Sequence, residues 1–227
     1  MNKSDFHKIE NYMLSCMGDS AHDSQHVYRV LFIALDIAEH EKNVDKDILI
    51  AACLLHDIGR KEQFEDPSLC HAQVGAEKAR TFLLENGFDS EFADRVAACV
   101  RKHRYRSASP PEKMEEKILF DSDKLEAAGL MGIARSLLYE GKAGTPIYSL
   151  GSDFEVLDGT GNEPPSFFRE YNFKLKKVYS GFYTSRAKKI AKARESAAAA
   201  FYEELLFESR AAYSGKRILS EYLETCF

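Results

Sequence analysis

One apolar run, together with the two ionisable residues that end it, constrains the fold of this chain more than any other feature. The run DILIAACLL, residues 47–55, is apolar at almost every position and is followed directly by His56 and Asp57. A helix that is apolar on most sides belongs in a protein core. A buried carboxylate that has neither a cation nor hydrogen-bond donors is disfavoured by roughly several kcal/mol. The sequence therefore predicts a buried helix whose end needs a positively charged partner.

Apolar residues recur at helical spacing through most of the chain. In residues 26–40, positions such as Val27 and Val30 follow the three-and-four spacing of one helix face. The segment 112–141 carries two glycines, so that it forms either one long helix or two in series. No segment alternates in the manner of a β-strand, and the predicted fold class is all-α. The segments predicted as helical are 26–40, 47–56, 71–87, 89–103, 112–141, 164–183 and 185–209.

A stretch rich in glycine and proline divides the chain. Residues 142–165 have this composition and are predicted to form a long loop, which in a compact domain is usually functional or disordered. This loop is a candidate cover for the pocket. We predict a core at residues 1–141 and C-terminal helices at residues 166–227, which pack back on the core within one structural domain.

Composition and charge exclude several classes of protein. The chain has 227 residues and a formal net charge of −5, so its bulk charge does not suit a nucleic-acid duplex. No apolar run approaches the roughly 20 residues of a membrane-spanning helix, and the N-terminus lacks the features of a signal peptide. The five cysteines form no CxxC pair, which favours free thiols in a reducing compartment. We expect a cytoplasmic protein that has no zinc-thiolate site and does not contact a membrane.

Imidazoles and carboxylates gather at the predicted helix ends. Together they are ligand types that suit iron, manganese, zinc or magnesium. An ion bound there would neutralise a buried carboxylate and lower the pKa of a coordinated water molecule. If the helix ends converge, these residues form a metal site. The candidates are His26, His56, Asp57, His71 and His103, with Asp121 and Asp123 inside the apolar pattern of ILFDSDKLEA.

Local cations accompany these candidates although the chain as a whole is anionic. Arg60 and Lys61 follow the His-Asp pair, and the cluster RKHRYR, residues 101–106, surrounds His103 with cations such as Arg104. Cations beside a metal site suit a substrate that carries phosphate oxygens. The cluster 101–106 is equally well explained as the solvated face of a helix. The favoured partner is a small phosphorylated molecule.

Several motifs in combination resemble the HD superfamily of metal-dependent phosphohydrolases. The resemblance covers roughly residues 20–135. The C-terminal segment 172–206 is similar to the helical tail of a bacterial subgroup that includes nucleotide pyrophosphohydrolases. The resemblance implies an HD-domain helical bundle with additional C-terminal helices. The motifs are HDSQHVYRV, AACLLHDIGR, HAQVGAEKA, VRKHR and DSDKLEAAG.

The family pattern implies a role for each candidate. It makes His26, His56, Asp57 and a distal aspartate the ligands of a first metal ion. We assign the distal role to Asp123, because the acidic residue of the family usually precedes a basic or small residue and then leucine, as in SDKLEA. Asp121 is the competitor, and since two residues separated by two positions on a helix point in different directions, we do not expect both to bind the same ion. In family members with two ions, residues like His71 and His103 bind the second ion and the aspartate of the HD pair bridges the two. The implied catalytic residues are Asp57 and Arg60, and the implied substrate-binding residues are Arg60, Lys61 and Arg104.

The function that we predict is hydrolysis of a phosphoester or phosphoanhydride in a small substrate, with a nucleotide as the favoured class. The cofactor is one or two divalent ions, drawn from Mn, Mg, Fe, Co, Ni and Zn, and a homo-oligomer is compatible with the sequence. Two alternatives stay open. A di-iron oxygenase could use the same scaffold, and a nucleotide-sensing module could bind without turnover.

Overall fold

The structure is a computed structural model that describes residues 1–17, 24–104 and 109–225. Within this part of the chain the regular structure is helical, apart from a single antiparallel bridge between Leu150 and Val156. The all-α prediction is therefore confirmed. No helix in the described ranges is both long enough and apolar enough to cross a bilayer.

The chain folds into two compact units. The first comprises Met1–Glu126 and Gly181–Ile190, and the second comprises Ala127–Ser180 and Ala191–Phe227. The predicted division into residues 1–141, 142–165 and 166–227 stays a prediction, because compactness alone does not define a domain that folds by itself.

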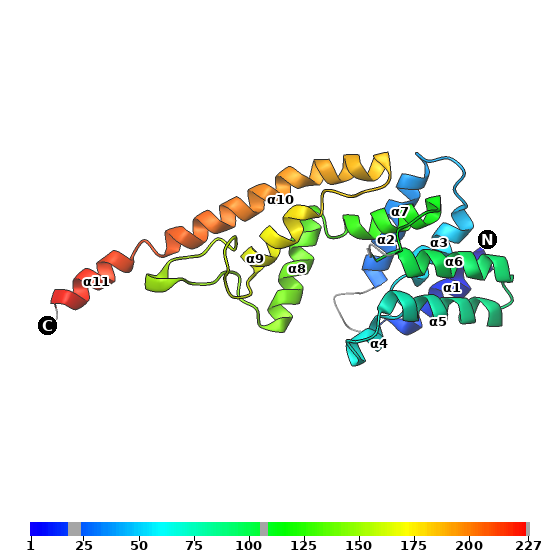
Figure 1. Ribbon diagram of the computed structural model, residues 1–227, viewed down its shortest axis with the longest axis horizontal. Helices are drawn as coiled ribbons and strands as arrows, with labels where there is room; N and C mark the ends of the chain where they lie inside the picture. The colour runs from blue at the N-terminus through cyan, green and yellow to red at the C-terminus, as the bar shows by residue number, and fades with distance from the viewer. Residues whose placement is uncertain (18–23, 105–108, 226–227) are drawn as a thin grey trace. The chain divides into compact units, whose positions relative to one another are not determined.

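Figure 1 shows α1 to α7 gathered in the first unit. Their bounds are α1 (Lys3–Cys16), α2 (Ser24–Ala38), α3 (Lys46–Leu55), α4 (Arg60–Glu65), α5 (His71–Glu85), α6 (Ser90–Lys102) and α7 (Met114–Leu125). The second unit holds α8 (Gly129–Ala143), η1 (Ser152–Phe154), α9 (Phe167–Phe173), η2 (Leu175–Lys177) and α11 (Lys216–Thr225). Helix α10 (Ser185–Ala212) begins in the first unit and continues in the second.

Helix α3 is the buried helix that the apolar run predicted. Its N-cap is Asp45, whose side chain accepts a hydrogen bond from the Ile48 backbone N–H at 3.2 Å. It packs against α1, α2, α6 and α7. Its C-cap is His56, which is itself fully buried, so the helix delivers an imidazole into the interior of the unit. The buried residues within α3 are Ile48, Leu49, Ala51, Ala52, Cys53, Leu54 and Leu55.

The segment 112–141 forms two helices, which settles the alternative that its glycines left open. Helix α7 ends at Leu125, and α8 begins at Gly129, where the backbone has a φ of +77°. Glycine takes this left-handed conformation without the steric penalty that a side chain brings. The break separates the two units, because Glu126 closes the first stretch of the first unit.

The second unit has its own apolar core, in which rings from α9 and α10 pack together. Tyr171 and Tyr202 stack with ring centroids 4.4 Å apart. The Tyr202 hydroxyl donates to the Asp158 carbonyl at 2.6 Å and thereby holds the predicted 142–165 loop within this unit. The core residues are Ile133, Val156, Phe167, Phe168, Tyr171, Leu175, Ala198, Tyr202 and Leu206.

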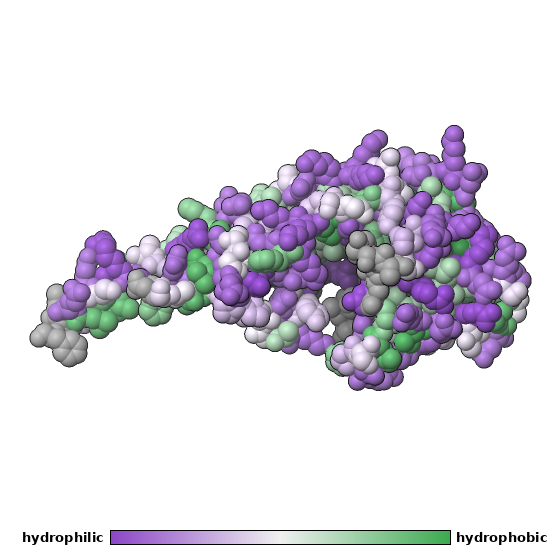
Figure 2. Space-filling model, viewed as in Figure 1, coloured by the Kyte–Doolittle hydropathy of each residue, from purple (hydrophilic) through white to green (hydrophobic). Residues whose placement is uncertain are grey.

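Helix α11 exposes an apolar face. Ile218, Leu219 and Leu223 are each more than half exposed, and Figure 2 shows hydrophobic surface along this helix. The remaining positions are mostly polar or charged, so the helix is amphipathic.

A glycine lets the turn after α3 approach α5. A Cβ atom on Gly59 would lie 2.4 Å from the His71 carbonyl oxygen and 2.7 Å from the Gly75 nitrogen. Lys78 also reaches this turn, because its Nζ donates to the Ile58 carbonyl at 2.9 Å. The absence of a side chain at Gly59 therefore allows the His-Asp pair and His71 to lie side by side.

Replacement of Gly59 by alanine should separate these two segments. The added methyl group would overlap backbone atoms, and overpacking of this kind lowers the free energy of unfolding by about 1–3 kcal/mol. Chemical denaturation of Gly59→Ala measures the loss. Gly141→Ala is the control, because a Cβ atom there meets nothing within 4 Å. Equal stability of the two variants would contradict the close approach.

Candidate metal centre

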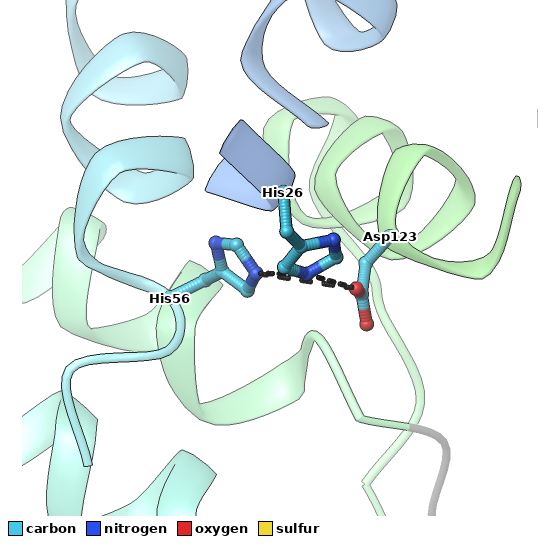
Figure 3. A group of neighbouring side chains, drawn as sticks. All are labelled: His26, His56 and Asp123. Carbon is cyan, nitrogen blue, oxygen red and sulfur yellow. Dashed lines mark hydrogen bonds and ion pairs between the residues drawn. The ribbon is translucent and has the colours of Figure 1, made fainter. Parts of the chain in front are cut away.

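Three residues from separate helices form a first cluster. His26 lies on α2, His56 at the C-terminal end of α3 and Asp123 on α7, as Figure 3 shows. The Nε2 atoms of the two histidines are 3.3 Å apart, and His26 Nε2 lies 3.3 Å from Asp123 Oδ1. Both imidazoles are buried, whereas the Asp123 side chain is 24% exposed. The cluster therefore has a buried side and a side that solvent reaches.

Asp57 connects this cluster to a second one. Its Oδ2 atom lies 3.6 Å from His26 Nε2 and 3.7 Å from His56 Nε2. Its Oδ1 atom lies 3.7 Å from the Nε2 atoms of both His71 and His103. The latter two nitrogens are 3.2 Å apart. One fully buried carboxylate thus faces two pairs of imidazoles, one pair with each oxygen.

Hydrogen bonds behind the rings determine which ring nitrogen carries the proton. His56 Nδ1 lies 2.7 Å from the Cys53 carbonyl oxygen, and His103 Nδ1 lies 2.6 Å from the Val100 carbonyl oxygen. A carbonyl oxygen can only accept a hydrogen bond, so Nδ1 must donate. In the neutral ring, Nε2 is then unprotonated and directs its lone pair toward the cluster. This is the arrangement in which imidazoles bind metals.

Burial keeps two of the rings neutral. It is the main cause that lowers the pKa of His56 to about 4 and the pKa of His71 to about 3. For His71 the charge of Arg60 acts in the same direction. Burial works to raise the pKa of Asp123, but the hydrogen bond with His26 and the charges of nearby histidines outweigh it and lower the pKa. Near neutral pH, His56 and His71 are therefore neutral and Asp123 is a carboxylate, which are the protonation states that ligands require.

Donor type and spacing both fit a divalent ion. Each cluster offers imidazole nitrogens and a carboxylate oxygen that all lie within 4.8 Å of one another. Two nitrogens bound to one ion at about 2.1 Å, with an angle between roughly 90° and 110°, lie about 3.0–3.4 Å apart. The Nε2 pairs match this spacing at 3.3 Å and 3.2 Å. Two unprotonated nitrogens cannot hydrogen-bond to each other, so a cation between them relieves their repulsion.

Sequence reasoning missed three residues behind the ligands. Glu126, which is 2% exposed, places Oε2 3.3 Å from His26 Nδ1 and 2.7 Å from Arg29 Nε. Gln63 Oε1 accepts from His71 Nδ1 at 2.7 Å. Arg29 follows His26 by three positions on α2, and Glu126, the C-cap of α7, follows Asp123 by three positions, which is the available sequence signal. Residues in such places orient ligands and tune their basicity.

Asp121 has a different task from Asp123. Its oxygens accept hydrogen bonds from the backbone N–H groups of Tyr183 and Thr184 at 2.7–3.2 Å and from the Thr184 hydroxyl at 2.7 Å. Burial is the main cause that raises its pKa. Asp121 therefore anchors the start of α10, and the structure brings Asp123 to the histidines.

The cations near the site differ in their contacts. Arg60 Nε donates to Asp57 Oδ1 at 2.8 Å, whereas Lys61 and Arg104 are exposed. Arg101 and Lys102 form ion pairs with Glu77 and Glu116. The remaining residues of the basic cluster that the sequence indicated, Tyr105 and Arg106, lie outside the described residues, as do His22 and Asp23 of the first motif.

The fold is all-α, and it brings together two His/Asp clusters that could each hold a metal ion. Residues 23–128 match the family model of the HD domain, and these residues contain every member of both clusters. The resemblance that the motifs predicted is therefore confirmed for this region, which is similar to the HD domain. At the level of the family, this similarity supports a metal-dependent hydrolase.

Relatives match the chain over most of its length. The protein YpgQ of Bacillus subtilis is 28% identical over 204 residues, which cover 87% of this chain and 90% of that protein. The crystal structure of YpgQ in complex with ADP is 26% identical, covers 89% of this chain and 97% of its own, and has a TM-score of 0.69. The crystal structure of a predicted HD superfamily hydrolase from an uncultured Thermotogales bacterium is 29% identical, covers 92% and 99%, and has a TM-score of 0.60.

Asparagine at positions 121 and 123 should separate the two roles. Asp123→Asn removes a charged donor from the first cluster, so we expect the affinity for Mn²⁺ to fall by about 10–100-fold or more. Asp121→Asn leaves buried donors without a suitable acceptor and lowers the free energy of unfolding by about 1–3 kcal/mol. Isothermal titration and chemical denaturation measure both quantities. Loss of Mn²⁺ affinity in Asp121→Asn alone would reverse the assignment.

Proposed function

We propose that this protein is a phosphohydrolase that cleaves a phosphoester or phosphoanhydride bond in a small substrate, with a nucleotide as the favoured class. The observation that carries the proposal is the position of Asp57, whose carboxylate faces the Nε2 atoms of two pairs of imidazoles at 3.6–3.7 Å. A divalent ion, when bound, supplies positive charge beside a phosphate and lowers the pKa of a coordinated water molecule.

The residues of the two clusters have different roles in the proposed reaction. The ion would be held by His26, His56, Asp57 and Asp123. Among these residues, we place Asp57 next to the phosphate group and the water molecule that react. In the reaction, water adds across the bond between phosphorus and the leaving oxygen, and a proton passes to the leaving group or to solvent. No oxidant or reductant takes part.

Local positive charge supports a phosphorylated substrate. Arg60 has a side chain that is 29% exposed and lies against Asp57, so its outward N–H groups can meet phosphate oxygens beside the centre. Lys61 and Arg104 are exposed cations that follow the His-Asp pair and His103 in the sequence. We assign these three residues to phosphate binding and charge stabilisation. The complex of YpgQ with ADP supports the choice of a nucleotide.

A phosphate-release screen tests the proposal. Nucleoside mono-, di- and triphosphates are incubated anaerobically with Mn²⁺, Mg²⁺, Co²⁺ or Fe²⁺, and phosphate and pyrophosphate are measured. We expect turnover that His56→Ala and Asp57→Asn reduce by more than about a hundredfold, because even residues behind metal ligands contribute about 10–100-fold.

The matched control is His40→Ala, which removes an exposed histidine whose Nδ1 lies 2.9 Å from the Asp36 carbonyl oxygen. Its activity should equal that of the unaltered protein. Absence of turnover with every nucleotide and ion would contradict the proposal. Oxygen consumption by an iron-loaded sample that releases no phosphate would favour an oxygenase.

A further inference from the structure

Resting on the proposed function, we propose that the protein works with one divalent ion, and that Arg60 takes the place of a second one. The ion would bind His26, His56, Asp123 and the Oδ2 atom of Asp57. The cluster of Asp57 Oδ1, His71 and His103 would receive its positive charge from the Arg60 guanidinium.

The position of Arg60 is the first argument. Its Nε atom donates to Asp57 Oδ1 at 2.8 Å, and this is the oxygen that faces His71 and His103 at 3.7 Å. The Arg60 guanidinium keeps its charge at all accessible pH values. A second ion would have to share this oxygen with a permanent cation and bind close to it. Like charges in a buried site repel strongly.

The distribution of carboxylates is the second argument. The first cluster has the Asp123 carboxylate and Asp57 Oδ2, so two acidic groups face an ion there. The second cluster has a single carboxylate oxygen, which already forms an ion pair with Arg60. A divalent ion is therefore better compensated at the first cluster. This difference exists although both clusters have histidine pairs at nearly equal spacing.

The groups behind the histidines add a third difference. Glu126, a carboxylate, lies behind His26, whereas the neutral amide of Gln63 lies behind His71. A carboxylate behind an imidazole raises its basicity as a ligand more than an amide does. Arg29 offsets part of the Glu126 charge through its 2.7 Å contact. The first cluster remains the one with the greater negative charge around its ligands.

Metal stoichiometry tests the inference without substrate. The protein is loaded with Mn²⁺ and dialysed, and the ions bound per chain are counted by mass spectrometry. Electron paramagnetic resonance reports whether two ions are coupled. We expect one uncoupled Mn²⁺ in the unaltered protein and a coupled pair in Arg60→Met, which keeps the length of the side chain and removes its charge. Arg60→Lys and the neighbouring control Lys61→Met should each bind one ion.

Two results would overturn the inference. One is two ions in the unaltered protein, and the other is a single ion in a folded Arg60→Met. His71→Ala gives an independent check if Arg60→Met does not fold, because this variant should keep one ion with its affinity changed less than about threefold. A large loss of affinity in His71→Ala would place the resident ion in the second cluster. If the proposed function is wrong, phosphate release will be absent, but the number of Mn²⁺ ions bound per chain will be as expected. The two proposals can therefore fail separately.

Discussion

The carboxylate of Asp57 is the group on which the rest of the centre depends. It is fully buried, and its two oxygens lie 3.6–3.7 Å from the Nε2 atoms of four histidines. A buried carboxylate needs positively charged partners, because removing it from water costs roughly several kcal/mol. The ends of α2, α3, α5 and α6 converge around it, and each contributes one imidazole. The packing of these four helix ends therefore determines which side chains surround Asp57.

Local helix chemistry orients half of these imidazoles. His56 and His103 are the C-cap residues of α3 and α6, and each bonds through Nδ1 to a carbonyl oxygen three residues earlier. The last carbonyl groups of a helix have no partner within it, so the ring satisfies one of them. The same bond places the proton on Nδ1 and directs the Nε2 lone pair into the cluster. Two metal-type donors thus arise from the way in which two helices end.

Candidate site residues that belong to a local sequence motif could be predicted from the sequence. Residues whose role depends on contacts between distant parts of the chain could not. His56 and Asp57 interrupt an apolar run, and the HD motifs pointed to His26, His71, His103 and Asp123, which the structure brings together. Glu126 was missed, because its three-residue spacing from Asp123 does not show its contact with His26, which joins residues 100 positions apart. The role of Gly59 was not predictable from the sequence, because it depends on the close approach of α5. The SDKLEA motif favoured Asp123 over Asp121, and packing brings Asp123 to His26 and His56.

Asp57 and Asp123 differ in the partners that can balance their negative charge. Asp57 has the guanidinium of Arg60 on one oxygen. Asp123 faces His26 and His56, and burial lowers the pKa of His56 to about 4, so that ring is neutral near pH 7. The first cluster therefore depends more on an external cation than the second does. A cation that binds only the folded chain adds to its stability in proportion to RT ln(1 + [L]/Kd). Binding of a cation to the first cluster would therefore stabilise the first unit against unfolding. The carboxylates that would bind this cation are the ones that the proposed reaction uses.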